Sequence, residues 1–153
     1  MNKNLCLYIL MRTDLDSMHT GRACAQASHA SNSFIHRYGK LKSVKDWTKQ
    51  TIDGFGTAIV LGVSKEEMMN LFIGDFVQKF PHGLVQDPEY GVSIPSEIVR
   101  FLKTEKEEMR TFWLKQSDKG LKYTLYRQEY TCMYIFGDRE ELKPLLGNLP
   151  LYS

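Results

Sequence analysis

The chain has 153 residues, of which 42% are hydrophobic and 25% charged, a composition typical of one folded domain. Twenty Lys and Arg residues against eighteen Asp and Glu give a net charge of +2, which excludes a polybasic tail. Three widely spaced cysteines exclude a disulfide framework, and no apolar segment reaches the ~20 residues that cross a bilayer. We therefore expect one domain over residues 1–153, in a cytoplasmic protein without a membrane partner.

The first half of the chain alternates between strand and helix patterns. Leu5–Met11 and residues 56–63 are apolar at consecutive positions, as in strands that are covered on both faces. From Thr20 onward, small and apolar side chains recur at helical spacing and predict a helix with the core positions Ala23, Ala27, Ala30 and Phe34. A second helix is expected from Ser43 toward Asp53.

The next segment begins with a capping box, Ser64–Glu67, which predicts a helix that runs to Phe80 before Pro81 ends it. Residues 84–86 then predict a short strand that Asp87 and Pro88 terminate. The charge-rich, amphipathic residues 95–122 indicate a helical insertion.

The last elements are a strand and a short helix. Residues 123–136 are rich in β-branched and aromatic side chains, which favours a strand. Asp138–Glu141 can cap a final helix, which Pro144 keeps short. Alternating strands and helices predict an α/β fold, a three-layer α/β/α sandwich with a four-stranded, mostly parallel (mixed) central sheet.

The candidate site follows from this fold class, since ligands bind beyond the carboxyl ends of strands in such sheets. Residues 12–21 follow the first strand, and residues 87–90 follow the third. The first loop leads into a helix N-terminus, which attracts anions, and Arg22 adds a fixed cation there. Arg22, Gln26 and His29 share one helical face by spacing, although a merely solvated face would show the same spacing.

The sequence gives little support for metal or nucleotide-cofactor chemistry. No glycine-rich nucleotide loop and no metal-ligand spacing of His or Cys is present, so we expect no metal and no cofactor. Residues 37–49 concentrate basic side chains, among them Lys40, Lys42 and Lys45, with Tyr38 and Trp47 nearby. This segment either contacts a nucleic-acid backbone or is a solvated loop.

Two segments resemble the archaeal and eukaryotic-type (type II) peptidyl-tRNA hydrolases. Arg12-Thr-Asp-Leu15 matches that family's R-[ST]-D-L loop, and the ten residues from Gly21 to Ala30 match its G-K-x-A-A-Q-x-x-H-A helix start. Residues 56–80, 84–87 and 131–152 resemble later elements of the family more weakly, and 95–122 then reads as an insertion before the last strand. Arg22 stands at the family's catalytic lysine, and the run after Asp87 lacks the family's threonine.

The resemblance implies hydrolysis of the ester in peptidyl-tRNA without a cofactor, with tRNA as the partner and a homodimer as the assembly. For this reaction we expect catalytic roles for Arg22, Asp87 and His29, with His19 as an alternative base because an imidazole suits proton transfer near neutral pH. We further expect a set of substrate-binding residues, of which the lysines belong to the basic segment 37–49: Arg12, Asp14, His19, Thr20, Gln26, Tyr90, Lys40, Lys42 and Lys45. Two other functions remain open: a catalytically inactive relative that binds tRNA, and a protein-interaction module that docks a partner on the insertion.

Overall fold

The computed structural model describes residues 4–94, 112–116 and 123–153. The chain divides into two compact units, residues 1–85 with 131–153, and residues 86–130. Every helix of the described residues belongs to the first unit. Two strands, β3 (His82–Ile94) and β5 (Tyr123–Asp138), continue from the first unit into the second.

The strands of the described residues form one mixed sheet. Besides β3 and β5 it contains β1 (Leu5–Arg12), β2 (Ala58–Val63) and β4 (Phe112–Gln116). The order is β2-β1-β5-β3, and β4 pairs with β5 beside this path. β1 and β2 are parallel, whereas β5 runs antiparallel to both β1 and β4.

The α/β class is confirmed, and the path β2-β1-β5-β3 is the expected four-stranded mixed sheet, to which β4 adds beside β5. The expectation that this sheet is mostly parallel is wrong, because among the described strands β1–β2 is parallel and the other pairs are antiparallel. The parallel pair β1–β2 is joined by the long helical connection that a parallel pair requires. Only residues 117–122 separate β4 from β5, which is too short for a crossover and therefore gives antiparallel neighbours.

Four α-helices and one 3₁₀ turn accompany the sheet in the described residues. They are α1 (Thr20–Tyr38), α2 (Lys42–Thr48), α3 (Lys65–Ile73), η1 (Val77–Lys79) and α5 (Arg139–Leu146). The predicted capping box is present at Ser64 and Glu67, and Asp138 caps α5, which is short as Pro144 predicts. α3 nevertheless ends well before Phe80, because Gly74 adopts an extended conformation and favours the helix end.

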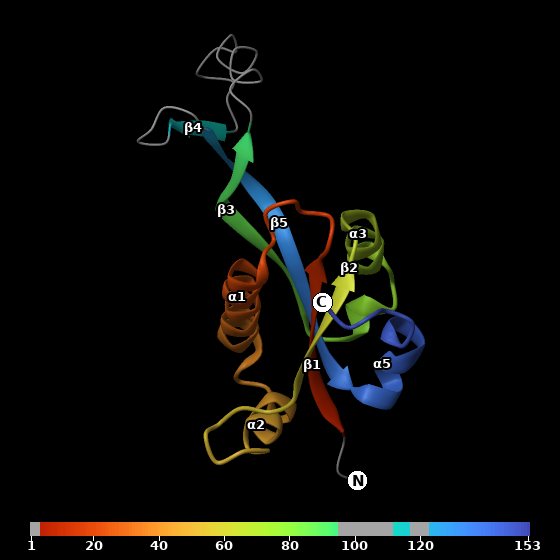
Figure 1. Cartoon of the computed structure of the whole chain (residues 1–153). Coiled ribbons are helices and arrows are strands. Elements are labelled where there is room, and N and C mark those ends of the chain that lie inside the picture. Colours follow the sequence, from red (N-terminus) through yellow and green to blue (C-terminus); the bar gives the residue numbers. More distant parts are fainter. Residues whose placement is uncertain (1–3, 95–111, 117–122) are drawn as a thin grey trace. The chain divides into compact units, whose positions relative to one another are not determined.

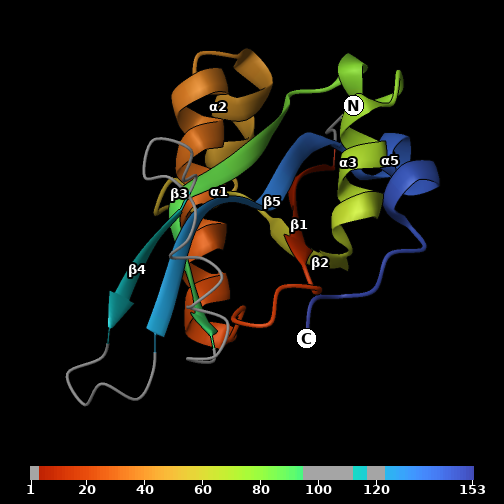
Figure 2. The ribbon, with the colours of Figure 1, turned by 90° about the horizontal axis from the view of Figure 1, so that it is seen from above.

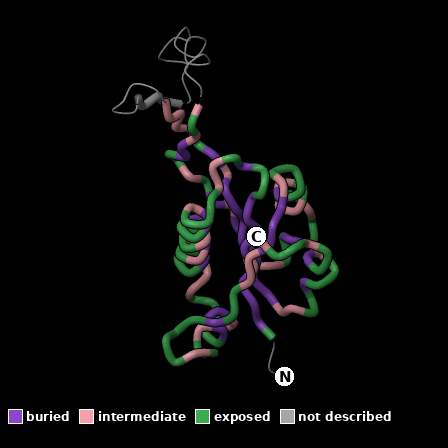
Figure 3. The backbone as a smooth tube through the Cα atoms, in the orientation of Figure 1, coloured by how far each residue is buried: buried purple, intermediate pink, exposed green. Residues whose placement is uncertain are grey.

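Helices cover both faces of the sheet in the first unit (Figures 1 and 2): α1 and α2 lie on one face, α3 and α5 on the other. Leu7 and Ile9 of β1 join an apolar cluster with Phe34 of α1 and Trp47 of α2. The ring of Phe34 packs edge-on against Trp47, with 5.8 Å between centroids. Burying each such side chain stabilises the fold by about 1.5–3 kcal/mol. In Figure 3 the strands of this unit are mainly buried, whereas the helices that cover them carry many exposed residues.

Two expectations about the second unit are corrected. The strand predicted for residues 84–86 continues through Asp87 and Pro88 to Ile94. Proline is tolerated there because, among the described strands, β3 ends the strand order and one of its sides has no ladder to support. The expected helical insertion at 95–122 contains a strand, β4, in its described part; residues 95–111 and 117–122 lie outside the described residues.

Candidate functional site

The loop after β1 begins with an ion pair that reaches α3. Arg12 is only 5% exposed, and its Nε donates to Oδ1 of Asp14 at 2.8 Å. The other oxygen, Oδ2, accepts the backbone N–H of Lys65 at 3.0 Å. Partial burial raises the pKa of Asp14, but the hydrogen bonds from Arg12 and Lys65 outweigh it and leave this pKa below its usual value. These two predicted substrate-binding residues therefore brace the loop against α3.

Further hydrogen bonds fix the rest of the loop. The Thr13 N–H donates to the carbonyl oxygen of Val63 at 2.9 Å, which ties the loop to the end of β2. Leu15 is buried, and its carbonyl accepts the Met18 N–H at 2.9 Å. The hydroxyl of Tyr152, near the end of the chain, donates to the carbonyl of Met18 at 3.3 Å. These hydrogen bonds thus fix the start of α1 beside the carboxyl end of β1.

The first turn of α1 presents positive charge. His19 is the N-cap, and its Nδ1 accepts the backbone N–H of Arg22 at 3.4 Å. The first turn contains no acidic residue. The N–H groups of Thr20 and Gly21 belong to the helix end that has no intrahelical acceptor, so they add to the attraction for an anion.

The hydrogen bond from the Arg22 N–H to Nδ1 also affects whether His19 can act as a base. Because Nδ1 accepts a hydrogen bond, a neutral His19 ring carries its proton on Nε2 in this arrangement. Nε2 is then a donor, which suits contact with a phosphate oxygen better than removal of a proton from water.

Arg22, Gln26 and His29 differ in their surroundings, although their spacing is shared. Arg22 is half-buried and His29 is exposed, whereas Gln26 is 2% exposed. The Oε1 of Gln26 accepts the hydroxyl of Thr131 on β5 at 2.6 Å, and that hydroxyl also lies 3.5 Å from the carbonyl oxygen of Val85 on β3. The interpretation of this helical face as fully solvated is therefore wrong at Gln26. Its hydrogen bond to Thr131 ties α1 to the sheet.

Thr131 is the residue that sequence reasoning missed. It is completely buried, and it is the first residue of β5 that belongs to the first unit. Its signal in the sequence is one threonine at the start of a stretch that is otherwise aromatic, aliphatic or sulfur-containing, residues 131–136. A buried polar side chain in such a stretch requires a partner, but the sequence does not name Gln26.

Asp87 and Tyr90 belong to the second unit, whereas the residues of α1 belong to the first. Asp87 is half-buried, and its Oδ1 accepts the N–H of Glu89 at 2.9 Å, which forms a turn around Pro88. Tyr90 is 1% exposed. The roles predicted for these two side chains stay predictions.

The three predicted lysines lie at the other end of α1. Lys40 lies between α1 and α2, whereas Lys42 and Lys45 lie on α2. All three are exposed, and Lys42 pairs with Asp46 at 2.6 Å. With 19 residues, α1 is about 28 Å long, and the three lysines follow its far end in the chain. The predicted site residues of the first unit therefore form two groups, one around the start of α1 and one after its end.

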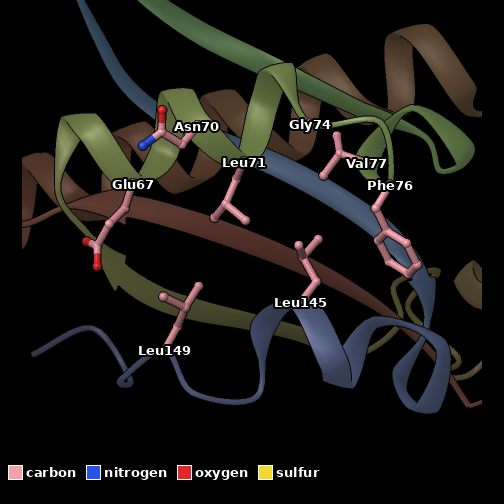
Figure 4. A pocket seen from close by; sticks show the side chains of 8 residues that line it. All are labelled: Glu67, Asn70, Leu71, Gly74, Phe76, Val77, Leu145 and Leu149. Carbon is pink, nitrogen blue, oxygen red and sulfur yellow. The ribbon is translucent and has the colours of Figure 1, made fainter.

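A hollow also lies between α3 and α5, within the first unit (Figure 4). It has a volume of about 330 Å³, and its walls are mainly apolar, with Leu71 facing Leu145 and Leu149. Its one acidic side chain, Glu67, accepts the Ser64 N–H of the capping box at 2.7 Å. This hollow offers apolar contact but no group suited to hydrolysis.

Neither a metal cluster nor a membrane span is found in the described part of the chain. No three His, Cys, Asp or Glu side chains there converge as metal ligands. None of its helices combines the length and apolar character that crossing a membrane requires.

Comparison with known proteins connects this geometry to a family. The family model for peptidyl-tRNA hydrolase PTH2 matches residues 5–152, which is nearly the whole chain. A search of curated proteins finds no match.

Proposed function

Since the chain belongs to the peptidyl-tRNA hydrolase PTH2 family, we propose that it hydrolyses the ester between a peptide and the 3′ ribose of tRNA. The observation that carries this proposal is the start of α1. A braced loop holds a helix N-terminus with Arg22 in its first turn and no acidic residue, at the carboxyl end of β1. Such a site binds a terminal phosphate or a developing oxyanion.

The reaction needs a base, a positioned water and a group that stabilises negative charge. In the proposal, the oxygen of water attacks the carbonyl carbon of the ester while the Asp87 carboxylate takes one water proton. The tetrahedral intermediate then collapses: the bond between the carbonyl carbon and the ribose oxygen breaks, and that oxygen receives the proton. The products are the peptide acid and tRNA with a free hydroxyl, so no cofactor is consumed.

The α1 residues have different proposed tasks. Arg22 donates hydrogen bonds to the oxyanion or the terminal phosphate, because a guanidinium keeps its proton in proteins. His29 and the Nε2 of His19 contact the substrate from exposed positions. Gln26 acts indirectly, since its hydrogen bond to Thr131 fixes the position of the helix.

Release of the acyl group from N-acetylaminoacyl-tRNA tests this proposal. Asp87→Asn keeps an oxygen that can accept the Glu89 N–H, so the local turn persists while the base is lost. We expect turnover to fall about 100-fold or more, in the range for general-base removal, with tRNA binding retained. Asp75→Asn, at an exposed position of the first unit, is the matched control. Unchanged turnover in Asp87→Asn would refute the role of Asp87.

Arg22 supports one alternative function, a relative that binds tRNA without hydrolysing it. A lysine can exchange a proton, whereas arginine cannot, so the substitution at the family's lysine position removes that chemistry. A wild-type protein that binds tRNA without turnover, together with turnover in Arg22→Lys, would establish this alternative.

A further inference from the structure

A second hollow of the first unit lies between α5 and the strands β1 and β2. It has a volume of about 310 Å³. Three of its lining residues are on the sheet, namely Tyr8 of β1 and Ile59 and Leu61 of β2, and Tyr8 and Ile59 are neighbours in the register of these strands. α5 covers the face of the sheet opposite α1 (Figures 1 and 2). This hollow is therefore separate from the start of α1, where the proposed reaction takes place.

The segment after α5 forms one wall of this hollow. Leu151 lines it and pairs with Leu61 in an isolated antiparallel bridge. Two backbone hydrogen bonds on either side of this bridge, with N···O distances of 2.8 and 3.0 Å, hold the segment against β2. The wall is thus fixed by the same kind of pairing that holds the sheet together.

Two cationic side chains line the hollow without an ion-pair partner among the described residues. Arg139 is half-buried in the first turn of α5, and Lys143 is exposed one turn later. The Nε–H of Arg139 is buried and has no hydrogen-bond acceptor in the described part of the chain. A buried donor in this state is unfavourable unless a ligand or a water molecule accepts from it or from its neighbours.

The neighbouring groups do not cancel this positive charge. Burial raises the pKa of the Cys6 thiol, although the Arg139 guanidinium acts to lower it, so the thiol stays neutral at pH 7. Burial likewise raises the pKa of Tyr8, whose hydroxyl therefore stays protonated. Glu140 is the one acidic residue among those that line the hollow; it is exposed and forms no ion pair with either cation. Two cations against one carboxylate leave the hollow with a net positive charge.

The remaining lining is aliphatic and indicates the other half of the ligand. Besides the sheet residues, Leu146, Leu149 and Leu151 line the hollow. One water molecule occupies about 30 Å³ in the liquid, so about 310 Å³ admits about ten non-hydrogen atoms. A straight-chain carboxylate of about eight carbon atoms has this size, with an anionic head and an aliphatic tail. The hollow of Figure 4 has a similar volume, but no cation is among its lining residues, so it does not complement the head.

We propose that the hollow between α5 and β2 binds a small aliphatic carboxylate, with the anionic head against Arg139 and Lys143 and the chain against the leucine side chains. The carboxylate accepts hydrogen bonds from two charged donors, and such bonds are stronger than those between neutral groups. The site uses none of the residues of the proposed hydrolysis, so either proposal can fail without the other.

Titration of the ¹⁵N-labelled protein with octanoate, followed by ¹H–¹⁵N correlation spectra, measures the affinity and locates the site. We expect a dissociation constant of about 1 mM or below, which a ligand of about ten atoms reaches at ordinary efficiency. The shifted signals should gather at β2, α5 and residues 149–151 and should spare Asn70 and Leu71 of the other hollow. Octanamide has the same size without the charge, and butyrate has the charge without the long chain. Each should bind about tenfold more weakly than octanoate, or weaker still.

The decisive variants remove the two cations. Lys143→Gln should weaken octanoate binding about fivefold, because it removes an exposed charge, and Arg139→Gln/Lys143→Gln should abolish the binding. The matched control is Lys49→Gln, which has the same charge change at an exposed position after α2 and should keep the full affinity. Circular dichroism checks that all three variants are folded.

Four outcomes would overturn the proposal. Equal affinity for octanoate and octanamide would show that the cations do not select the ligand. Shifts that gather at Asn70 and Leu71 would assign the chain to the hollow of Figure 4. Unchanged affinity in Arg139→Gln/Lys143→Gln would place the anion elsewhere, and no saturable shift with octanoate at about ten times the expected dissociation constant would leave the hollow without this ligand.

Discussion

The Arg12–Asp14 pair makes the loop of the candidate site sensitive to one substitution, Asp14→Asn. The variant keeps an oxygen for one hydrogen bond but removes the negative charge beside a guanidinium that is 5% exposed. Hydrogen bonds to charged groups contribute about 1.5–3 kcal/mol, and the Asp14 side chain is 40% exposed, so solvent screens part of this. We expect Asp14→Asn to lower the free energy of unfolding by about 1–2 kcal/mol at pH 7.

The same pair predicts the direction of a pH dependence. The pKa of Asp14 in the folded protein is below its usual value, since hydrogen bonds from Arg12 and Lys65 outweigh the effect of partial burial. Folding therefore favours the ionised carboxylate, and its contribution is complete above the unfolded pKa of about 3.9. The contribution is lost as the pH falls through the lower, folded pKa.

Urea denaturation of the wild-type protein and Asp14→Asn, at pH 7 and again near pH 3, measures both effects. The difference in the free energy of unfolding should be present at pH 7 and shrink at the lower pH. Asp75→Asn, at an exposed position, should show little difference at either pH. A difference for Asp14→Asn that stays constant with pH, or is absent at pH 7, would refute the bracing role of this pair.

Two further predictions concern buried groups of the first unit. Thr131→Val removes the hydroxyl that donates to the buried Oε1 of Gln26 and should lower the free energy of unfolding by about 1–3 kcal/mol. In a double-mutant cycle with Gln26→Met, the losses of the two single variants should not add. Additive losses would contradict the hydrogen bond between these two side chains. Burial raises the pKa of Cys132 to about 12 and also raises that of Cys6, whereas Cys24 is exposed. A disulfide reagent at pH 8 should therefore react quickly with one thiol in the native protein and with all three in urea, and fast reaction of two native thiols would contradict this burial.

Local sequence signals predict the elements that they directly stabilise. α1 begins at Thr20 as expected, because its apolar positions recur at helical spacing and His19 supplies a cap. The capping box at Ser64 likewise marks the start of α3. Both signals lie within a few residues of the structure that they specify, so no knowledge of distant partners is needed.

The features that sequence analysis misplaced depend on distant partners. A proline normally ends a strand, and the place of Pro88 inside β3 follows only from the edge position that this strand has among the described strands. β4 forms a strand through pairing with β5, which the amphipathic pattern of its sequence does not reveal. Gln26 has the spacing of an exposed position, and only its partner Thr131, 105 residues away, explains its burial.

Arg22 determines how the candidate chemistry is divided between residues. A lysine in the first turn of α1 could both attract an anion and exchange a proton, whereas a guanidinium only attracts and donates. Any proton that moves during ester hydrolysis must therefore move between water, a carboxylate such as Asp87 and the ribose oxygen. In the proposed reaction, Arg22 then contributes anion binding at the helix end, and proton transfer is assigned to Asp87. This division explains why Asp87→Asn and Arg22→Lys are separate tests: the first removes the base, and the second asks whether proton exchange at the helix end is needed at all.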